Sequence, residues 1–71
     1  YPSASIIINA ANEVLVSEFL KKKIPFMDIY KQIFGIMNDR NFKKYAIKKP
    51  KNLKEIFKID TWAKSTIRAK I

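Results

Sequence analysis

The sequence contains no cysteine and no histidine, and these two absences exclude much side-chain chemistry. Without cysteine there is no disulfide, no thiolate nucleophile and no thiolate metal ligand, and without histidine the commonest general base and zinc ligand are missing. Gly35 is the one glycine. A glycine-rich phosphate loop is therefore excluded, and the many tight turns of a β-sandwich or barrel are disfavoured. These absences favour an all-α fold.

Long apolar runs are also absent, because the longest, such as Ile6 to Ile8, have only three residues. A membrane-spanning helix needs about 18 to 20 consecutive apolar residues. The first residues, Tyr1-Pro2-Ser3, show no basic region followed by an apolar segment, so no signal peptide is expected. The sequence does not begin with methionine, which suggests a fragment or a processed product.

The charge balance is strongly basic, with fifteen Lys and Arg residues against six Asp and Glu and a formal net charge of +9. Such a charge raises the possibility of a nucleic acid or an anionic membrane as partner. Only Arg40 and Arg68 are arginines, and arginine makes most bidentate contacts with bases and phosphates. Solvated lysines in a compositionally biased sequence are the simpler explanation. With 71 residues, 48% of them hydrophobic, the chain is long enough for one small domain of marginal stability.

Apolar residues at helical spacing predict a first helix from about Ser5 or Asn9 to Lys22. Asn9 is a candidate N-cap, which would place Glu13 near the positive end of the helix dipole. Pro25 disfavours helical backbone in the residue before it and so ends this segment.

A second helix is predicted from about Met27 to Asn38, with its apolar residues on one stripe. Gly35 within it suggests a close approach to another helix. Residues 39 to 51 are expected to form a polar, lysine-rich and variable linker that ends near Pro50. The stripe comprises Phe26, Ile29 or Tyr30, Ile33, Phe34, Ile36 and Met37, and the linker contains three candidate anchors, Phe42, Tyr45 and Ile47.

The last third of the chain predicts a short helix followed by a final one. Asn52 and Glu55 have the spacing of a capping box, in which each side chain bonds a backbone amide of the other. Asp60 is a second candidate N-cap, for a last helix that carries Trp62 and Ala63. Together the elements predict a single domain over residues 1–71, an all-α fold of about four helices in a small antiparallel bundle.

No group of residues has the spacing of a catalytic or metal site. The carboxylates are best explained as structural, because no pair lies at the spacing that metal binding or acid–base catalysis needs. Trp62 is expected in the core or at an interface. Asn9 and Asn12 leave two readings open, fixed hydrogen bonds to a neighbouring segment, or a cap plus an exposed polar residue. The six carboxylates are Glu13, Glu18, Asp28, Asp39, Glu55 and Asp60.

One stretch of the sequence is specific enough to suggest a family. It reads Asn9-Ala10-Ala11-Asn12-Glu13-Val14, then Glu18-Phe19-Leu20, and after the lysines Ile24-Pro25-Phe26-Met27-Asp28-Ile29. This resembles the C-terminal region of 1-deoxy-D-xylulose 5-phosphate reductoisomerases, with N-A-A-N-E-x-x-V-x-x-F-L and then I-x-F-x-D-I. The end of the chain also resembles that region, through Asn52-Leu53-Lys54-Glu55-Ile56 and Ile59-Asp60-Thr61-Trp62-Ala63-Lys64.

The resemblance implies a C-terminal helical domain of a larger enzyme, which uses NADPH and a divalent metal, Mg or Mn, in non-mevalonate isoprenoid biosynthesis. That enzyme would be a homodimer in the bacterial cytoplasm or in a plastid, including the relict plastids of parasites. None of the family's catalytic, cofactor or metal motifs is present here, so the fragment itself is expected to be inactive. Its partners would be the dinucleotide-binding and catalytic domains, with no nucleic acid or membrane. Structural or inter-domain roles are implied for six residues, Asn9, Asn12, Glu13, Asp28, Asp60 and Trp62.

Two alternatives from other classes remain. The charge, together with aromatic residues near Lys43, Lys44, Lys48 and Lys49, would suit a free-standing basic module that binds nucleic acid, with steep salt dependence. A helical protein-interaction module unrelated to isoprenoid synthesis is the other alternative.

Overall fold

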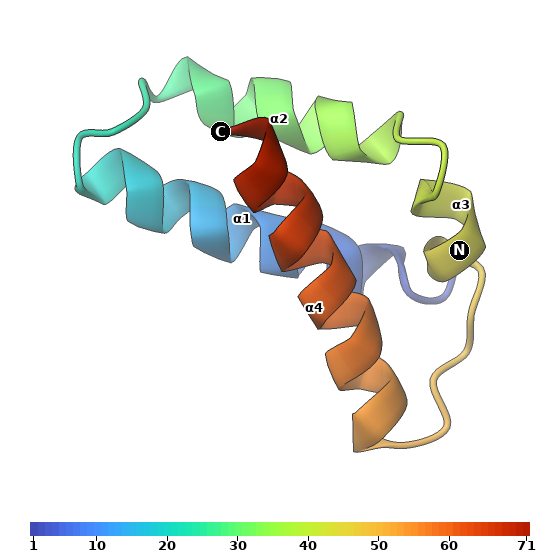
Figure 1. Cartoon of the computed structure of the whole chain (residues 1–71). Coiled ribbons are helices and arrows are strands. Elements are labelled where there is room, and N and C mark those ends of the chain that lie inside the picture. The colour runs from blue at the N-terminus through green and yellow to red at the C-terminus, as the bar shows by residue number, and fades with distance from the viewer.

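The chain forms four α-helices and no strand, and the computed structural model describes all of residues 1–71. The helices are α1 (Ala4–Leu20), α2 (Met27–Met37), α3 (Phe42–Ala46) and α4 (Leu53–Lys70). α1 and α2 run antiparallel beside each other, and α4 crosses them (Figure 1). None of these helices is long and apolar enough to cross a membrane. The prediction of an all-α bundle of about four helices is confirmed.

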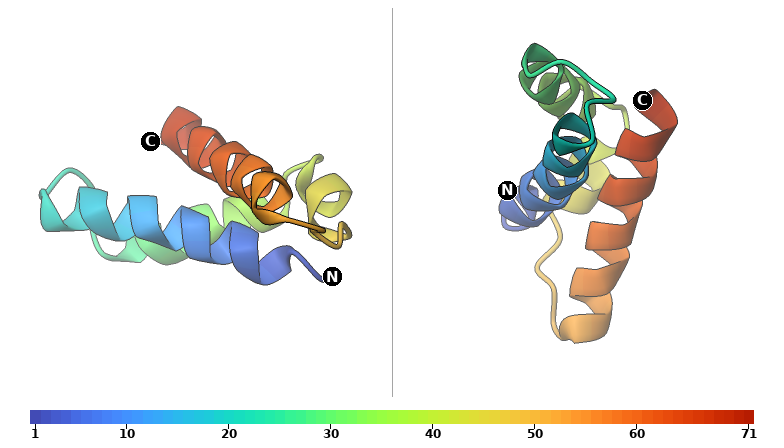
Figure 2. Two further views of the ribbon diagram at one scale, coloured as in Figure 1. Left: turned by 90° about the horizontal axis from the view of Figure 1, so that it is seen from below. Right: turned by 90° about the vertical axis from the view of Figure 1, so that its left-hand side faces the viewer.

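The helices form two layers. In the right-hand view of Figure 2, α1 and α2 lie on one side and α4 lies on the other. The smallest dimension of the backbone is 17 Å, which leaves room for only two layers at the usual distance of about 8–10 Å between helix axes. The α1–α2 pair is therefore covered by α4 on one side and has no helix over its other side.

α1 begins earlier than its capping residues suggested. Ser3 is buried, its amide donates to the carbonyl of Ala46 at 2.8 Å, and its hydroxyl donates to the carbonyl of Lys48. These bonds fix the start of α1 against the end of α3, and Ile7 enters the core. Asn9 is therefore not an N-cap, and Glu13 lies in the middle of α1 instead of near its positive end. Packing of the apolar first turns outweighs the local capping signal.

The end of α1 has an unusual backbone at Lys22, whose φ is +60°. The Lys22 amide donates to the Phe19 carbonyl at 2.9 Å, and the Lys23 amide donates to the Glu18 carbonyl at 3.0 Å. This pair of bonds is the Schellman motif, in which glycine usually occupies the left-handed position. The helix thus ends two residues before the predicted Lys22, ahead of Pro25.

α2 confirms the predicted second helix but not its single buried stripe. Ile29 and Ile36 are buried and Ile33 is half-buried, whereas the other apolar residues of the predicted stripe face solvent. Gly35 does not mark a close approach, because an added Cβ would meet only side-chain atoms of Gln32 and Lys70, at 3.7–3.9 Å. That is ordinary van der Waals contact.

The predicted linker contains α3. Phe42 is buried, and the Tyr45 ring stacks on the Trp62 ring with centroids 4.5 Å apart. The prediction that Ile47 anchors this segment against the bundle is wrong, because Ile47 is 53% exposed.

α4 is one continuous helix where two were expected. The Asn52 side chain accepts a bond from the Glu55 amide at 3.0 Å, so this half of the capping box is confirmed. The Glu55 carboxylate accepts from the Lys51 amide at 2.7 Å instead of from that of Asn52. Asp60 starts no helix. It lies in the interior of α4 and pairs with Lys64 one turn later, while Ile59 and Ala63 keep this part of the helix in the core.

Candidate docking face

The surface most suited to binding runs along the exposed side of α2 and across α1 to the first half of α4. Along α2, exposed apolar side chains occur at intervals of three, four and three residues, which places them on one side of the helix. They are Met27, Tyr30, Phe34 and Met37, with Phe26 just before the helix. Phe26 lies between Phe19 and Tyr30 in edge-to-face contacts, with ring centroids 5.5 and 5.7 Å away. Isolated exposed apolar residues are normal on a protein surface, but a continuous row of five marks an interaction site.

A shallow hollow of about 640 Å³ over the exposed side of α1 extends this surface. Ile33 of α2 borders it, and Ile33 lies three or four residues from Tyr30 and Met37, so the hollow and the α2 row adjoin. We call the row and the hollow together the outer face. The hollow is lined by Ser5, Ile6, Ile8, Asn9, Asn12, Ile33, Ile56 and Asp60.

The first recognisable block of the sequence is divided between the core and the outer face. Ala10 and Ala11 are fully buried, whereas Asn9 and Asn12 are exposed in the hollow. Neither asparagine side chain makes a hydrogen bond within the chain. Small alanines let α4 cross close to α1, while the two amides are directed outward and are available to another molecule.

Glu13 and Asp60 join α1 to α4 through Lys64. The Lys64 ammonium lies 3.2 Å from the Asp60 carboxylate and 3.6 Å from that of Glu13. The hydrogen bond that the Lys64 ammonium donates to the Asp60 carboxylate raises the pKa of Lys64 above its ordinary 10.5. Desolvation opposes this rise, and the charges of Asp60 and Glu13 add to it. The pairing therefore contributes stability below pH 10.5 and loses it as the pH rises through the higher folded-state pKa. Because these groups are accessible to solvent, the contribution is small.

Asp28 and Trp62 lie outside the hollow. Asp28 is half-buried in the first turn of α2, where a carboxylate interacts favourably with the helix dipole. Trp62 is half-buried against the core and stacked on Tyr45. Of the six residues with predicted structural or inter-domain roles, the structure thus brings Asn9, Asn12 and Asp60 together and joins Glu13 to Asp60 through Lys64.

The outer face is mainly apolar, with the amides of Asn9 and Asn12 and the Asp60 carboxylate at the hollow. No group of three carboxylates comes together as a potential metal site. The sequence pattern predicts a single apolar stripe that includes Phe26, Phe34 and Met37, so it does not predict the exposed α2 row. The available signal was that these residues span half the circumference of the helix, more than one neighbouring layer can cover.

Comparison with known proteins gives one consistent family. Residues 2–66 match the family model described as the DXP reductoisomerase C-terminal domain. A protein named 1-deoxy-D-xylulose 5-phosphate reductoisomerase from Francisella tularensis subsp. novicida (strain U112) is 41% identical over 58 residues, which cover 82% of this chain. One of the same name from Colwellia psychrerythraea is 40% identical over 63 residues, or 89% of this chain. The matched region is 14% of the length of each of these two relatives. No solved structure matches the chain significantly.

Proposed function

Because the chain belongs to the family of DXP reductoisomerase C-terminal domains, we propose that it acts as a structural domain that docks through its outer face onto the rest of such an enzyme. The relatives are about seven times longer than the region they share with this chain, so most of each relative lies outside the match. The outer face combines the exposed apolar row of α2 with the amides of Asn9 and Asn12 and the Asp60 carboxylate, which is already paired with Lys64. A surface of this composition supports a docking role.

The proposal extends to the whole enzyme. It would convert 1-deoxy-D-xylulose 5-phosphate to 2-C-methyl-D-erythritol 4-phosphate with NADPH and Mg or Mn, as a homodimer in a bacterial cytoplasm or a plastid. The test is the NADPH-oxidation rate of the purified full-length enzyme with this substrate, with the 71-residue chain as comparison. We expect turnover only from the full-length enzyme. Absence of substrate-dependent oxidation under conditions in which a bacterial relative is active would refute this activity.

The observation that carries the docking proposal is the row of five exposed apolar side chains on α2 next to the unpaired amides of Asn9 and Asn12. Such a row is costly in water, and it is stabilised when another protein surface covers it. Asn9 and Asn12 would then donate and accept hydrogen bonds across the boundary, and Glu13 and Asp60 would hold α1 and α4 in register beside it.

Alanine substitutions distinguish a structural role in docking from a role in substrate binding. In the full-length enzyme, Asn9→Ala, Asn12→Ala and Glu13→Ala together should lower the melting temperature by several degrees, about 2–4 °C for each kcal/mol lost, and leave KM unchanged. The control is Thr61→Ala with Ser65→Ala, two exposed positions on α4 outside the outer face. A rise in KM without a change in melting temperature would refute a structural role for the three residues.

A further inference from the structure

A second surface lies at the opposite end of the fold from the α1–α2 turn, where α3, the connection to α4 and the start of α4 meet. Residues 43 to 58 contain seven lysines and one acidic residue, Glu55. Five of these lysines and Glu55 surround a hollow of about 460 Å³, a volume typical of sites for small molecules. We call it the lysine hollow. It is lined by Lys44, Tyr45, Lys48, Lys49, Pro50, Lys51, Glu55, Lys58 and Ile59.

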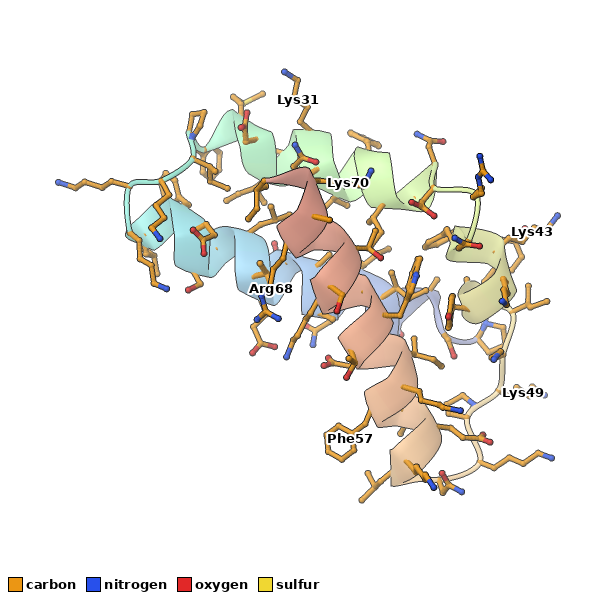
Figure 3. All side chains as sticks on the ribbon, in the orientation of Figure 1. Lys31, Lys43, Lys49, Phe57, Arg68 and Lys70 are labelled. Atoms are coloured by element: carbon orange, nitrogen blue, oxygen red, sulfur yellow. The ribbon has the colours of Figure 1, made fainter.

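The lysine hollow reaches from the surface to the core, which a row of lysines on an exposed surface would not do. Ile59, which lines it, is a core residue only 2% exposed. The lysines that line the hollow come from α3, from the connection after it and from α4, which only the fold brings together. Lys49 extends from the connection on the side away from α4 (Figure 3). A linear run of lysines in a flexible segment would have neither this depth nor this convergence.

Two of the lysines are held in place by an aromatic ring. The ammonium groups of Lys44 and Lys48 lie 5.8 and 5.3 Å from the centroid of the Tyr45 ring, within the range of a cation–π interaction. Tyr45 is itself fixed by its stack on Trp62. These contacts restrict the two side chains, and restricting them beforehand reduces the entropy that is lost when a ligand binds.

The positive charge of the lysine hollow is not balanced within the chain. Both ion pairs of the structure involve Lys64, which lies outside the hollow. The single carboxylate, Glu55, accepts a bond from the Lys51 backbone amide and pairs with no lysine. Five like charges around one hollow repel each other, and a compact ligand with several negative charges would relieve that repulsion.

We propose that the lysine hollow binds a small anion that carries two or more linked phosphate groups, such as an oligophosphate. Lysine is a common phosphate ligand that acts as a point charge. Several lysines around one hollow favour linked phosphates over a single one, because each further phosphate can contact further lysines. The volume of the hollow favours a compact anion over a long nucleic acid strand.

The test uses tripolyphosphate and inorganic phosphate as probes, with the 71-residue chain in 150 mM salt. Trp62 is the only tryptophan and stacks on Tyr45 at the edge of the hollow, so its fluorescence reports binding without any substitution. We expect a saturable change with tripolyphosphate and a much weaker one with phosphate. ATP, titrated in parallel, should match tripolyphosphate if the phosphates alone are recognised. Equal responses to phosphate and tripolyphosphate would refute the proposal.

Charge-matched variants distinguish binding in the lysine hollow from non-specific attraction of an anion to a basic protein. Lys44→Gln, Lys48→Gln and Lys58→Gln together should weaken tripolyphosphate binding about tenfold, since contacts between exposed charges are individually weak. Lys21→Gln, Lys22→Gln and Lys23→Gln remove the same charge at the far end of α1 and should change affinity less than twofold. Equal losses in both variants, or tighter binding of a single-stranded oligonucleotide that both variants weaken equally, would overturn the assignment in favour of non-specific charge attraction.

Discussion

Substitution of Phe34 by serine tests whether the chain functions alone or is docked in a larger enzyme, because the expected loss of stability differs between the two cases. Phe34 is a member of the α2 row and is 63% exposed. In the isolated chain its ring contributes little to the core, and phenylalanine and serine have similar helix propensities. We therefore expect Phe34→Ser to change the free energy of unfolding of the 71-residue chain by no more than about 0.5 kcal/mol, as is usual at surface positions.

The same substitution should have a larger effect in the full-length enzyme. Full burial of a phenylalanine side chain contributes about 1.5–3 kcal/mol, and docking would remove from water most of the 63% of Phe34 that is now exposed. A loss of about 1–2 kcal/mol is expected on that basis, which corresponds to a fall in melting temperature of about 2–8 °C. The NADPH-oxidation rate should fall only at temperatures near the new melting point.

Urea unfolding of the isolated chain and thermal unfolding of the full-length enzyme measure these two effects. Ile47→Ser is the control, because Ile47 is also exposed, at 53%, but lies on the connection after α3, away from the outer face. It should have a small effect in both proteins. If Phe34→Ser destabilises the full-length enzyme no more than Ile47→Ser does, the outer face is not covered by the rest of the enzyme and the docking proposal is wrong.

Substitutions at three further positions test the backbone of the isolated chain by urea unfolding. Gly35→Ala should stabilise it by up to about 1 kcal/mol, because alanine favours helix and an added Cβ would meet only side-chain atoms at ordinary van der Waals distances; a loss would mean that α2 and α4 approach more closely than described. Lys22→Gly should stabilise it by about 1 kcal/mol, since glycine adopts the left-handed backbone at this position without steric cost, and an unchanged midpoint would argue against that conformation. Asn52→Ala should destabilise it by about 1 kcal/mol through loss of the bond to the Glu55 amide, whereas Asn52→Asp should retain most of the stability.

The sequence predicted the class of the fold and most helix positions, because amphipathic spacing and proline are local signals. It failed where tertiary contacts outweigh such signals. Ser3 anchors the start of α1 through carbonyls more than forty residues away, and no local pattern reveals that bond. Asp60 has the residue type of an N-cap but lies within α4, because Ile59 and Ala63 on either side of it are buried. At Lys22 the usual signal for a helix end, glycine, is absent.

The candidate site was predictable only in part. The asparagines of the first block were identified as unusual, but their exposure depends on which side of α1 receives α4, and sequence spacing does not determine that. Most residues of the α2 row were recognised in the sequence as apolar, but they were expected to be buried. A sequence alone does not show how many neighbouring helices cover a given helix. The lysine hollow likewise requires three segments to converge.

Adjacent positions in the first block allow a direct test of its division between core and outer face. Ala11 is fully buried and Asn12 is exposed, so the same new side chain should have opposite consequences at the two sites. Ala11→Leu would force three extra carbons between packed helices and should cost the isolated chain about 1–3 kcal/mol.

Asn12→Leu should leave the free energy of unfolding of the isolated chain unchanged or raise it slightly. The reason is that leucine favours helix over asparagine by roughly 0.5 kcal/mol. In the full-length enzyme it should be destabilising, since it removes an amide proposed to hydrogen-bond across the docking boundary. Urea unfolding of the isolated chain and thermal unfolding of the enzyme provide the comparison. Equal losses for Ala11→Leu and Asn12→Leu in the isolated chain would mean that Asn12 is packed within the domain, and its role in docking would have to be abandoned.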